Sequence, residues 1–164
     1  MRPQLTLLKA STFLNRKYLF HDDESMNFCH NRFMARSTTE QKGKLLIIDD
    51  ENDILEILAD LLEDCASVIL QARNGEEAIE LLKSHRIDAI LSDEKMPKKS
   101  GIEVLRWLRE HEYQTPFIIH TGFGQKEVLK EAQKWGVFAV IDKPWDERKL
   151  ISTVEKALRS GVTL

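Results

Sequence analysis

The sequence has few cysteines, no long apolar run and little net charge, and each shortage excludes a class of protein. Among 164 residues there are two cysteines, Cys29 and Cys65, which match no zinc, haem or redox spacing. A disulfide is therefore not expected, and a reducing, cytoplasmic setting is the simplest interpretation. No apolar run reaches membrane-spanning length. The net charge of −3 indicates neither a nucleic-acid-binding protein nor an acidic tail.

Charge is unevenly distributed along the chain, and the division falls near residue 43. Residues 1–43 carry seven basic and four acidic side chains, whereas residues 44–164 carry seventeen and twenty-three. The first segment also has no sustained hydrophobic period, so we predict a disordered or loosely ordered N-terminal extension. Lys9 interrupts the apolar run that a signal peptide would need. A further hypothesis is that Met34 begins the functional chain.

From Lys44 onward, short apolar runs alternate with segments of helical period. None of the runs shows the in-out alternation of a half-exposed sheet, so we expect strands that are covered on both faces. Five strand-then-helix units with short connections predict an α/β domain with a parallel sheet between two layers of helices. The predicted strands are Leu45–Ile48, Val68–Leu70, Ala89–Leu91, Phe117–Ile119 and Val137–Ile141. We place this domain at residues 44–160, with 161–164 as a tail.

Polar side chains follow four of the five predicted strands. Ligands of open parallel sheets bind beyond the carboxyl ends of the strands, so these side chains are expected to converge. Three carboxylates and one ammonium have a formal charge of −2, which one divalent cation neutralises; all-oxygen ligation favours magnesium over zinc. Together with a hydroxyl donor they form a cradle for a phosphoryl group. The residues are Asp49 and Asp50, Asp93, Thr121 and Lys143.

Each of these residues also has a simpler structural interpretation. Asp49, Asn52 and Asp53 are each placed to cap the helix that begins near Ile54, although capping explains one acid and not two in series. Asp93 and Thr121 are ordinary turn residues, and Lys143 before a proline is often a solvated loop lysine. Their joint occurrence at strand ends argues against coincidence. His120, in contrast, lies within an apolar run, and we interpret it as a structural histidine with satisfied hydrogen bonds; the three tryptophans are interpreted as packing residues.

Four motifs give residues 44–160 a resemblance to the receiver domain of bacterial two-component response regulators, of the single-domain, chemotaxis-regulator-like kind. They are "IIDDEN", "LSDEKMPKKSG", "HTGFG" and "DKPW", which match that family in order and spacing. The resemblance implies a flavodoxin-like five-stranded parallel sheet in order 2-1-3-4-5 with five helices. It also implies a phosphoprotein that accepts phosphate from a sensor histidine kinase or a histidine phosphotransfer protein. Such a protein catalyses only its own phosphorylation and dephosphorylation and is not a turnover enzyme.

The resemblance assigns a role to each strand-end residue. It implies that Asp93 is the phosphoacceptor and that Thr121 and Lys143 hold the phosphoryl oxygens. It implies that Mg²⁺ is ligated by Asp50, Asp93 and the backbone carbonyl of Lys95, with Asp49 acting largely through bound water. The Lys143-Pro144 peptide is expected to be cis.

Three departures from the family pattern qualify this assignment. The position that usually holds a switch aromatic is Val140, with Phe138 two residues earlier. Lys95 and Phe123 occupy the places that flank the path of the hydrolytic water. Few residues follow the last predicted helix, so we expect a stand-alone receiver that signals through an unknown protein partner and not through nucleic acid.

Rival interpretations come from other classes of protein. A haloacid-dehalogenase-like phosphatase needs a second Asp where this chain has Glu51, and a flavodoxin needs hydroxyls and glycines where it has acids. The alternatives that stay open are an unphosphorylated receiver-like scaffold and a phosphate sink or relay intermediate.

Overall fold

The computed structural model describes residues 42–122 and 125–161, and within them five strands alternate with five helices. The strands are β1 (Lys44–Ile48), β2 (Val68–Ala72), β3 (Ala89–Asp93), β4 (Phe117–Thr121) and β5 (Ala139–Asp142). The helices are α2 (Asn52–Leu62), α3 (Gly75–Ser84), α4 (Gly101–Glu110), α5 (Gln125–Lys134) and α6 (Glu147–Gly161). The prediction of an N-terminal extension, and most of the predicted tail, fall outside the described residues.

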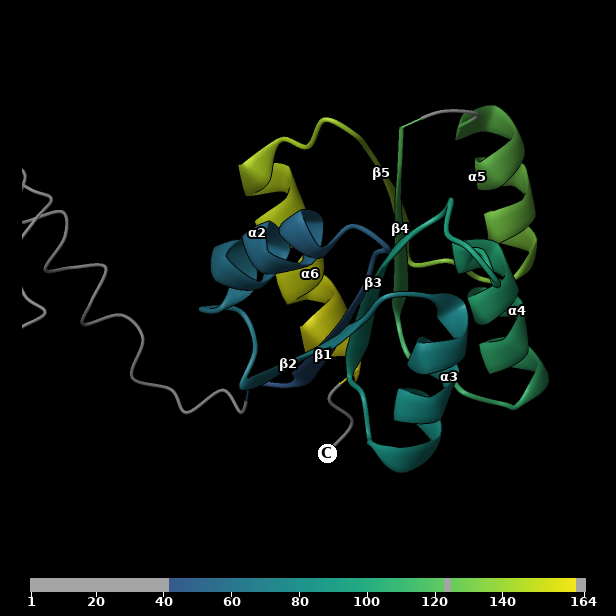
Figure 1. Ribbon diagram of the computed structural model, residues 1–164, viewed down its shortest axis with the longest axis horizontal. Helices are drawn as coiled ribbons and strands as arrows, with labels where there is room; N and C mark the ends of the chain where they lie inside the picture. Colours follow the sequence, from purple (N-terminus) through teal and green to yellow (C-terminus); the bar gives the residue numbers. More distant parts are fainter. Residues whose placement is uncertain (1–41, 123–124, 162–164) are drawn as a thin grey trace, which may run out of the picture. The chain divides into compact units, whose positions relative to one another are not determined.

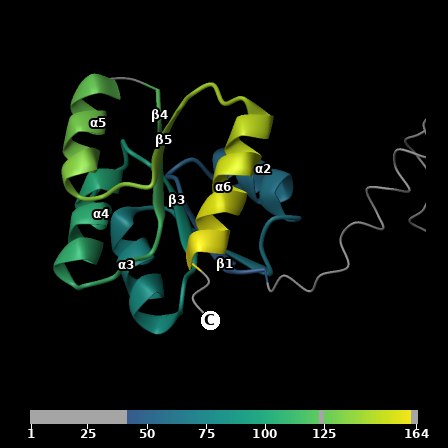
Figure 2. The same ribbon diagram turned by 180° about the vertical axis from the view of Figure 1, so that it is seen from behind.

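All five strands are parallel, and their order is β2-β1-β3-β4-β5. Helices α2 and α6 cover one face of the sheet, and α3, α4 and α5 cover the other (Figures 1 and 2). This is the flavodoxin-like arrangement that the resemblance implied, and it is confirmed. None of the described helices is both long enough and apolar enough to cross a membrane.

Side chains of the central strands divide alternately between two hydrophobic cores. Leu45 and Ile47 pack with α2 and α6, whereas Leu46 and Ile48 pack on the side of α3 and α4. The central strands β1, β3 and β4 are buried almost throughout. The expectation that every strand is covered on both faces is wrong for β2, where Val68 is 43% exposed, because β2 lies at the edge of the sheet.

The ends of β3 and β4 and the start of β5 differ from the predicted boundaries for local reasons. The sequence predicts that Asp93 and Thr121 follow β3 and β4, but they are the last residues of these strands. Asp93 still pairs with His120 of β4, and Thr121 still pairs with Asp142 of β5. β5 begins two residues later than predicted. Gly136 has a φ of +66°, and the N–H of Val137 donates to Ala132, so Val137 closes the end of α5 and is not free to start a strand.

The start of α4 packs tightly behind the end of β3. Ser100 and Glu103 form a capping box, in which each side chain accepts the backbone N–H of the other residue. A Cβ atom at Gly101 would lie 2.5 Å from the carbonyl oxygen of Asp93, so only glycine fits there without a backbone shift. This packing holds the backbone of Asp93 in place from the α4 side.

Candidate functional site

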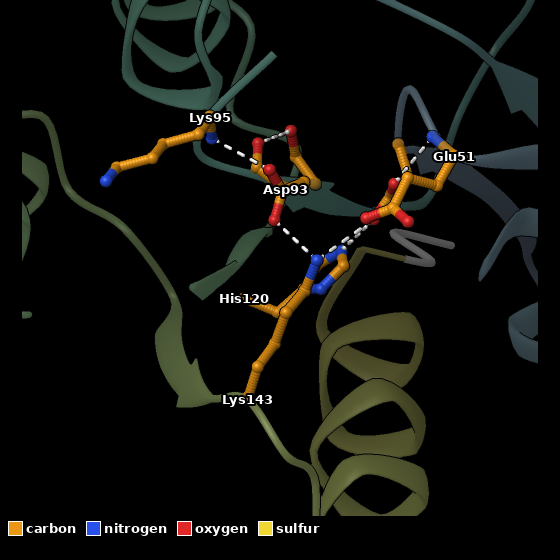
Figure 3. A network of polar contacts seen from close by, with 7 residues as sticks. Glu51, Asp93, Lys95, His120 and Lys143 are labelled. Atoms are coloured by element: carbon orange, nitrogen blue, oxygen red, sulfur yellow. Dashed lines mark hydrogen bonds and ion pairs between the residues drawn. The ribbon is translucent and has the colours of Figure 1, made fainter. Parts of the chain in front are cut away.

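The carboxyl ends of β1, β3, β4 and β5 bring charged side chains together at one edge of the sheet. Asp49 follows β1, Asp93 ends β3, and Lys143 follows β5. Figure 3 shows the side chains of Asp93, His120 and Lys143 pointing toward one another. The site therefore combines residues that are up to 94 positions apart in the sequence.

Asp49 is almost completely buried, with 1% of its surface exposed. Its Oδ1 accepts the backbone N–H of Glu51 at 3.0 Å, and its Oδ2 lies 3.2 Å from Nζ of Lys143. The capping interpretation of Asp49 is wrong, because Glu51 is the N-cap of α2 and no side chain caps that helix end. Burial raises the pKa of Asp49 above its ordinary value, against the lowering effects of the Glu51 N–H and of Lys143.

Asp93 makes two contacts, one through each carboxylate oxygen. Its Oδ2 accepts the backbone N–H of Lys95 at 2.8 Å, and its Oδ1 lies 2.6 Å from Nζ of Lys143 (Figure 3). The side chain is 10% exposed, so it is shielded but can be reached from solvent. One oxygen of Asp93 therefore orders the following loop, and the other faces the lysine.

Lys143 bridges the two buried carboxylates. Burial by itself lowers the pKa of Lys143, but the hydrogen bond to Asp93 and the charges of Asp49 and Asp93 outweigh it, so the pKa is raised. The Lys143-Pro144 peptide bond is cis, as expected. Because the Lys143 side chain is 24% exposed, its ammonium group can move from its carboxylate partners to an incoming anion.

Two other predicted site residues lie close by with different environments. Asp50 is exposed, next to the buried Asp49. Thr121 is 2% exposed, and its carbonyl oxygen accepts the N–H of Lys143 at 2.9 Å, which ties the end of β4 to the site lysine. The structure thus brings Asp49, Asp93 and Lys143 into contact and places Asp50 and Thr121 at the same edge of the sheet.

His120 is the residue that the sequence interpretation missed. It is 0% exposed, and neither ring nitrogen has a hydrogen-bond partner among the described residues, so the expectation of a satisfied histidine is wrong. An unpartnered buried polar group costs about 1–3 kcal/mol. Its Nε2 lies 3.7 Å from Oδ2 of Asp49, and its Cα is the register partner of Asp93. Burial, with a smaller effect of Lys143, lowers its pKa to about 3, so the ring is neutral at pH 7.

Aromatic side chains pack beside the buried histidine and against both hydrophobic cores. The Trp145 ring lies 5.5 Å from the His120 ring and packs on the core beneath α2 and α6. Its Nε1 is also buried without a hydrogen-bond partner among the described residues. Trp107 and Trp135 pack against the other core, as predicted. Phe138 is 41% exposed and lies just before β5, while Val140 is within it.

Glu94 is a titratable residue next to Asp93 that the sequence analysis did not single out. Burial, with a smaller contribution from Asp93, raises its pKa to about 7. Its Oε2 accepts the backbone N–H of Ile102 at 3.0 Å, so it binds the first turn of α4 next to Asp93. Sequence offers a weak signal for this role, because an acid eight positions before a helical N–H is not a recognised capping spacing.

The charges of this edge fit a divalent cation. Asp49, Asp50 and Asp93 with Lys143 have a formal charge of −2, and their donors are oxygens, which suit a hard ion such as Mg²⁺. The lysine ammonium stands between the two buried carboxylates and shows that a positive charge is stable there. The donor set therefore fits the metal that the sequence predicted.

Comparison with known proteins identifies the family of this chain. Residues 45–155 match the response regulator receiver domain family. The transcriptional regulatory protein YesN of Bacillus subtilis is 36% identical over 118 residues, which cover 70% of this chain and 32% of YesN. The transcriptional regulatory protein CpxR of Escherichia coli is 34% identical over 117 residues, which cover 71% of this chain and 50% of CpxR. The chain thus spans half or less of these curated relatives.

A solved structure shows the same fold at similar length. The chemotaxis response regulator CheY4 of Vibrio cholerae superposes with a TM-score of 0.65 at 26% identity, covering 71% of this chain and 99% of that chain. The five-stranded parallel order, the carboxylate and lysine edge and the match over residues 45–155 lead to one assignment. This chain belongs to the response regulator receiver domain family of two-component systems.

Proposed function

We propose that Asp93 accepts a phosphoryl group from a phosphohistidine of a sensor histidine kinase or a histidine phosphotransfer protein. The observation that carries the proposal is the 2.6 Å contact between Oδ1 of Asp93 and Nζ of Lys143. This contact places a cation beside the nucleophile, where it offsets repulsion between the carboxylate and an anionic donor. Receiver domains are phospho-accepting signalling modules, so the site and the family point to the same reaction.

The proposed reaction is a displacement at phosphorus. A carboxylate oxygen of Asp93 forms a bond to the phosphorus atom while the phosphorus–nitrogen bond to the donor imidazole breaks, and the imidazole leaves with the bonding electron pair. Lys95 orients the nucleophile, because its N–H holds Oδ2 of Asp93 at 2.8 Å. Lys143 and the hydroxyl of Thr121 bind the phosphoryl oxygens of the product. The phosphoryl group stays on Asp93 as the donor imidazole leaves, so the chain is a phosphoprotein and not a turnover enzyme.

Receiver domains typically bind Mg²⁺ at an acidic site, and the residues of this chain fit that ion. Asp50, Asp93 and the backbone carbonyl of Lys95 would hold it, with Asp49 acting through water. When bound, the ion supplies positive charge that neutralises phosphoryl oxygens. The exposure of Asp50 and the burial of Asp49 suit these two roles, since an exposed carboxylate reaches an ion at the surface most easily.

We further propose that the receiver acts alone and transmits its state by binding a protein partner in the cytoplasm. CheY4, which is matched along 99% of its length, supports a receiver of this size as a complete unit. YesN and CpxR are longer than the matched region, so a role as one module among several is the competing arrangement. An unphosphorylated scaffold and a phosphate sink or relay intermediate are the competing functions.

Acid-labile phosphate provides the test. The full chain is incubated with acetyl phosphate and MgCl₂, and the modified residue is located by mass spectrometry. We expect one phosphoryl group on Asp93, none with Asp93→Asn, and unchanged labelling with Asp142→Asn, which alters an exposed strand-end aspartate on β5. Labelling that persists on Asp93→Asn, or an unlabelled wild-type chain, would show that the acceptor assignment is wrong.

A further inference from the structure

The buried imidazole of His120 faces the two buried carboxylates of the site. His120 and Asp93 are register partners on β4 and β3, and alternation along each strand directs both side chains to the face that α2 and α6 cover. Figure 3 shows the His120 ring turned toward the same centre as the side chain of Asp93. One donor atom from each of Asp49, Asp93 and His120 lies within 4.8 Å of the others.

We propose that Asp49, Asp93 and Nε2 of His120 form a mixed nitrogen and oxygen site for a divalent transition-metal ion such as Mn²⁺. Donors of this kind lie about 2.0–2.2 Å from their metal, so two donors on one ion are about 3–4.4 Å apart. The 3.7 Å separation between Nε2 of His120 and Oδ2 of Asp49 is within that range. The three donor atoms lie within 4.8 Å of one another, so a shift of less than about 1 Å brings the most distant pair of donors into the same range.

The state of the histidine suits a ligand more than a hydrogen-bonding residue. Neither ring nitrogen has a hydrogen-bond partner among the described residues, so Nε2 presents a free lone pair in the tautomer whose proton is on Nδ1. A metal ligand must be the neutral imidazole, and a fully buried ring such as that of His120 favours the neutral form. Binding an ion would satisfy a buried polar atom that the described side chains leave unsatisfied.

The charge of the cluster matches a doubly charged ion. Two carboxylates and a neutral imidazole total −2, and the ammonium of Lys143 neutralises half of this charge in the structure. An ion would take the place of that ammonium, which can move because its side chain is 24% exposed. A nitrogen donor favours transition metals over Mg²⁺, which prefers oxygen ligands and retains water.

This inference shares two carboxylates with the proposed phosphorylation site, but it concerns the identity of the ion and the role of His120. Phosphorylation of Asp93 with MgCl₂ can succeed whether or not His120 binds a metal, so the two tests fail separately. The readout is therefore the coordination of Mn²⁺ and not phosphate transfer.

The test measures nitrogen coupling to Mn²⁺ by pulsed electron paramagnetic resonance on the full chain. We expect imidazole nitrogen modulation that changes on ¹⁵N-histidine labelling, disappears with His120→Leu and persists with His85→Gln, an exposed control. The Mn²⁺ dissociation constant, from the free-Mn²⁺ signal, should rise at least about tenfold with His120→Leu. The Mg²⁺ dissociation constant, from competition, should change less than about threefold.

Circular dichroism establishes that the variants fold, and His120→Asn provides a second variant that keeps a polar side chain at the buried position. Labelling of the wild-type histidines needs no substitution, so the experiment stays decisive if His120→Leu is unstable. Bound Mn²⁺ without nitrogen coupling, coupling that survives loss of His120, or no Mn²⁺ binding at millimolar concentration would each overturn the inference.

Discussion

The Nζ atom of Lys143 lies 2.6 Å from Oδ1 of Asp93 and 3.2 Å from Oδ2 of Asp49, so one lysine bridges two buried carboxylates. The three residues come from the ends of different strands, and the contact forms only when β1, β3 and β5 are all in place. Asp93 is the proposed acceptor of the phosphoryl group, and its contact with Lys143 therefore also helps to hold this edge of the sheet together.

Lys143→Met should destabilise the domain. It leaves two carboxylates buried without their cation, and we expect the free energy of unfolding to fall by roughly 1–3 kcal/mol in urea at pH 7 without divalent ions. Lys83→Met is the matched control, because Lys83 pairs with Glu80 on the exposed face of α3 and should change stability by less than about 0.5 kcal/mol. Equal losses in the two variants would contradict a special role for the Lys143 bridge.

Magnesium should raise the melting temperature of the full chain. Asp49, Asp50 and Asp93 repel one another, and an ion that binds only the folded state stabilises it by mass action. At ten times the dissociation constant the gain is about 1.4 kcal/mol, or roughly 3–5 °C. Differential scanning fluorimetry with MgCl₂ and with EDTA measures the shift, and Asp50→Asn should reduce it. An unchanged melting temperature at several millimolar MgCl₂ would argue against a metal site.

The contribution of His120 to stability should fall as the pH falls through the range in which an exposed histidine titrates, whereas the raised pKa of Glu94 acts in the opposite direction. The folded pKa of His120 is about 3, below the ordinary 6.5 of the unfolded chain. Between these values the unfolded chain binds a proton that the folded chain does not. The contribution of His120 to the free energy of unfolding is therefore present above pH 6.5 and is lost on acidification. From pH 7.5 to 5 the expected loss from His120 alone is about 2 kcal/mol.

The His120→Leu variant isolates this effect. Its free energy of unfolding, measured in EDTA at the same two pH values, should increase relative to that of the wild type on going from pH 7.5 to pH 5, by about 2 kcal/mol. His85→Gln, which alters an exposed histidine, should keep the wild-type slope. Parallel slopes for the wild type and His120→Leu would show that His120 titrates normally in the folded chain.

The phosphorylated state is expected to be long-lived. In this family the residues two positions after the acceptor and two after the hydroxyl flank the hydrolytic water, and here they are Lys95 and Phe123, the second of which lies outside the described residues. Lysine only donates hydrogen bonds and phenylalanine makes none, so an attacking water is poorly oriented. Loss of phosphate after donor removal should accelerate in a Lys95→Asn, Phe123→Glu double variant. If the double variant decays no faster, water access does not set the lifetime.

Deleting residues 1–33 should leave stability and phosphorylation unchanged. The described domain has its own two cores, and all the residues that build them follow Lys44. Melting temperature and acetyl phosphate labelling of the shortened chain, compared with the full chain, measure this. A drop of several degrees would show that the deleted segment stabilises the domain.

Local patterns in the sequence determined the number of strands, their parallel arrangement and the chemistry of the site. Each central strand is a short apolar run between helical segments, and a run buried on both faces is recognisable without its neighbours, as in Leu45–Ile48. Asp49, Asp93 and Lys143 stand at strand ends, and parallel strands carry such residues to one edge of the sheet. Family resemblance then supplied the strand order, which no local pattern contains.

Only the tertiary structure decided how the side chains at that edge face one another. His120 reads as one more residue of an apolar run, and its relation to Asp93 depends on the register between β3 and β4. Asp49 is buried while its neighbour Asp50 is exposed, and this difference depends on how the helices cover the sheet. The pKa of Glu94 depends on its burial against the first turn of α4, which it binds. These properties arise from contacts between residues distant in sequence, and a spacing pattern records which residues are near in the chain but not which become neighbours in space.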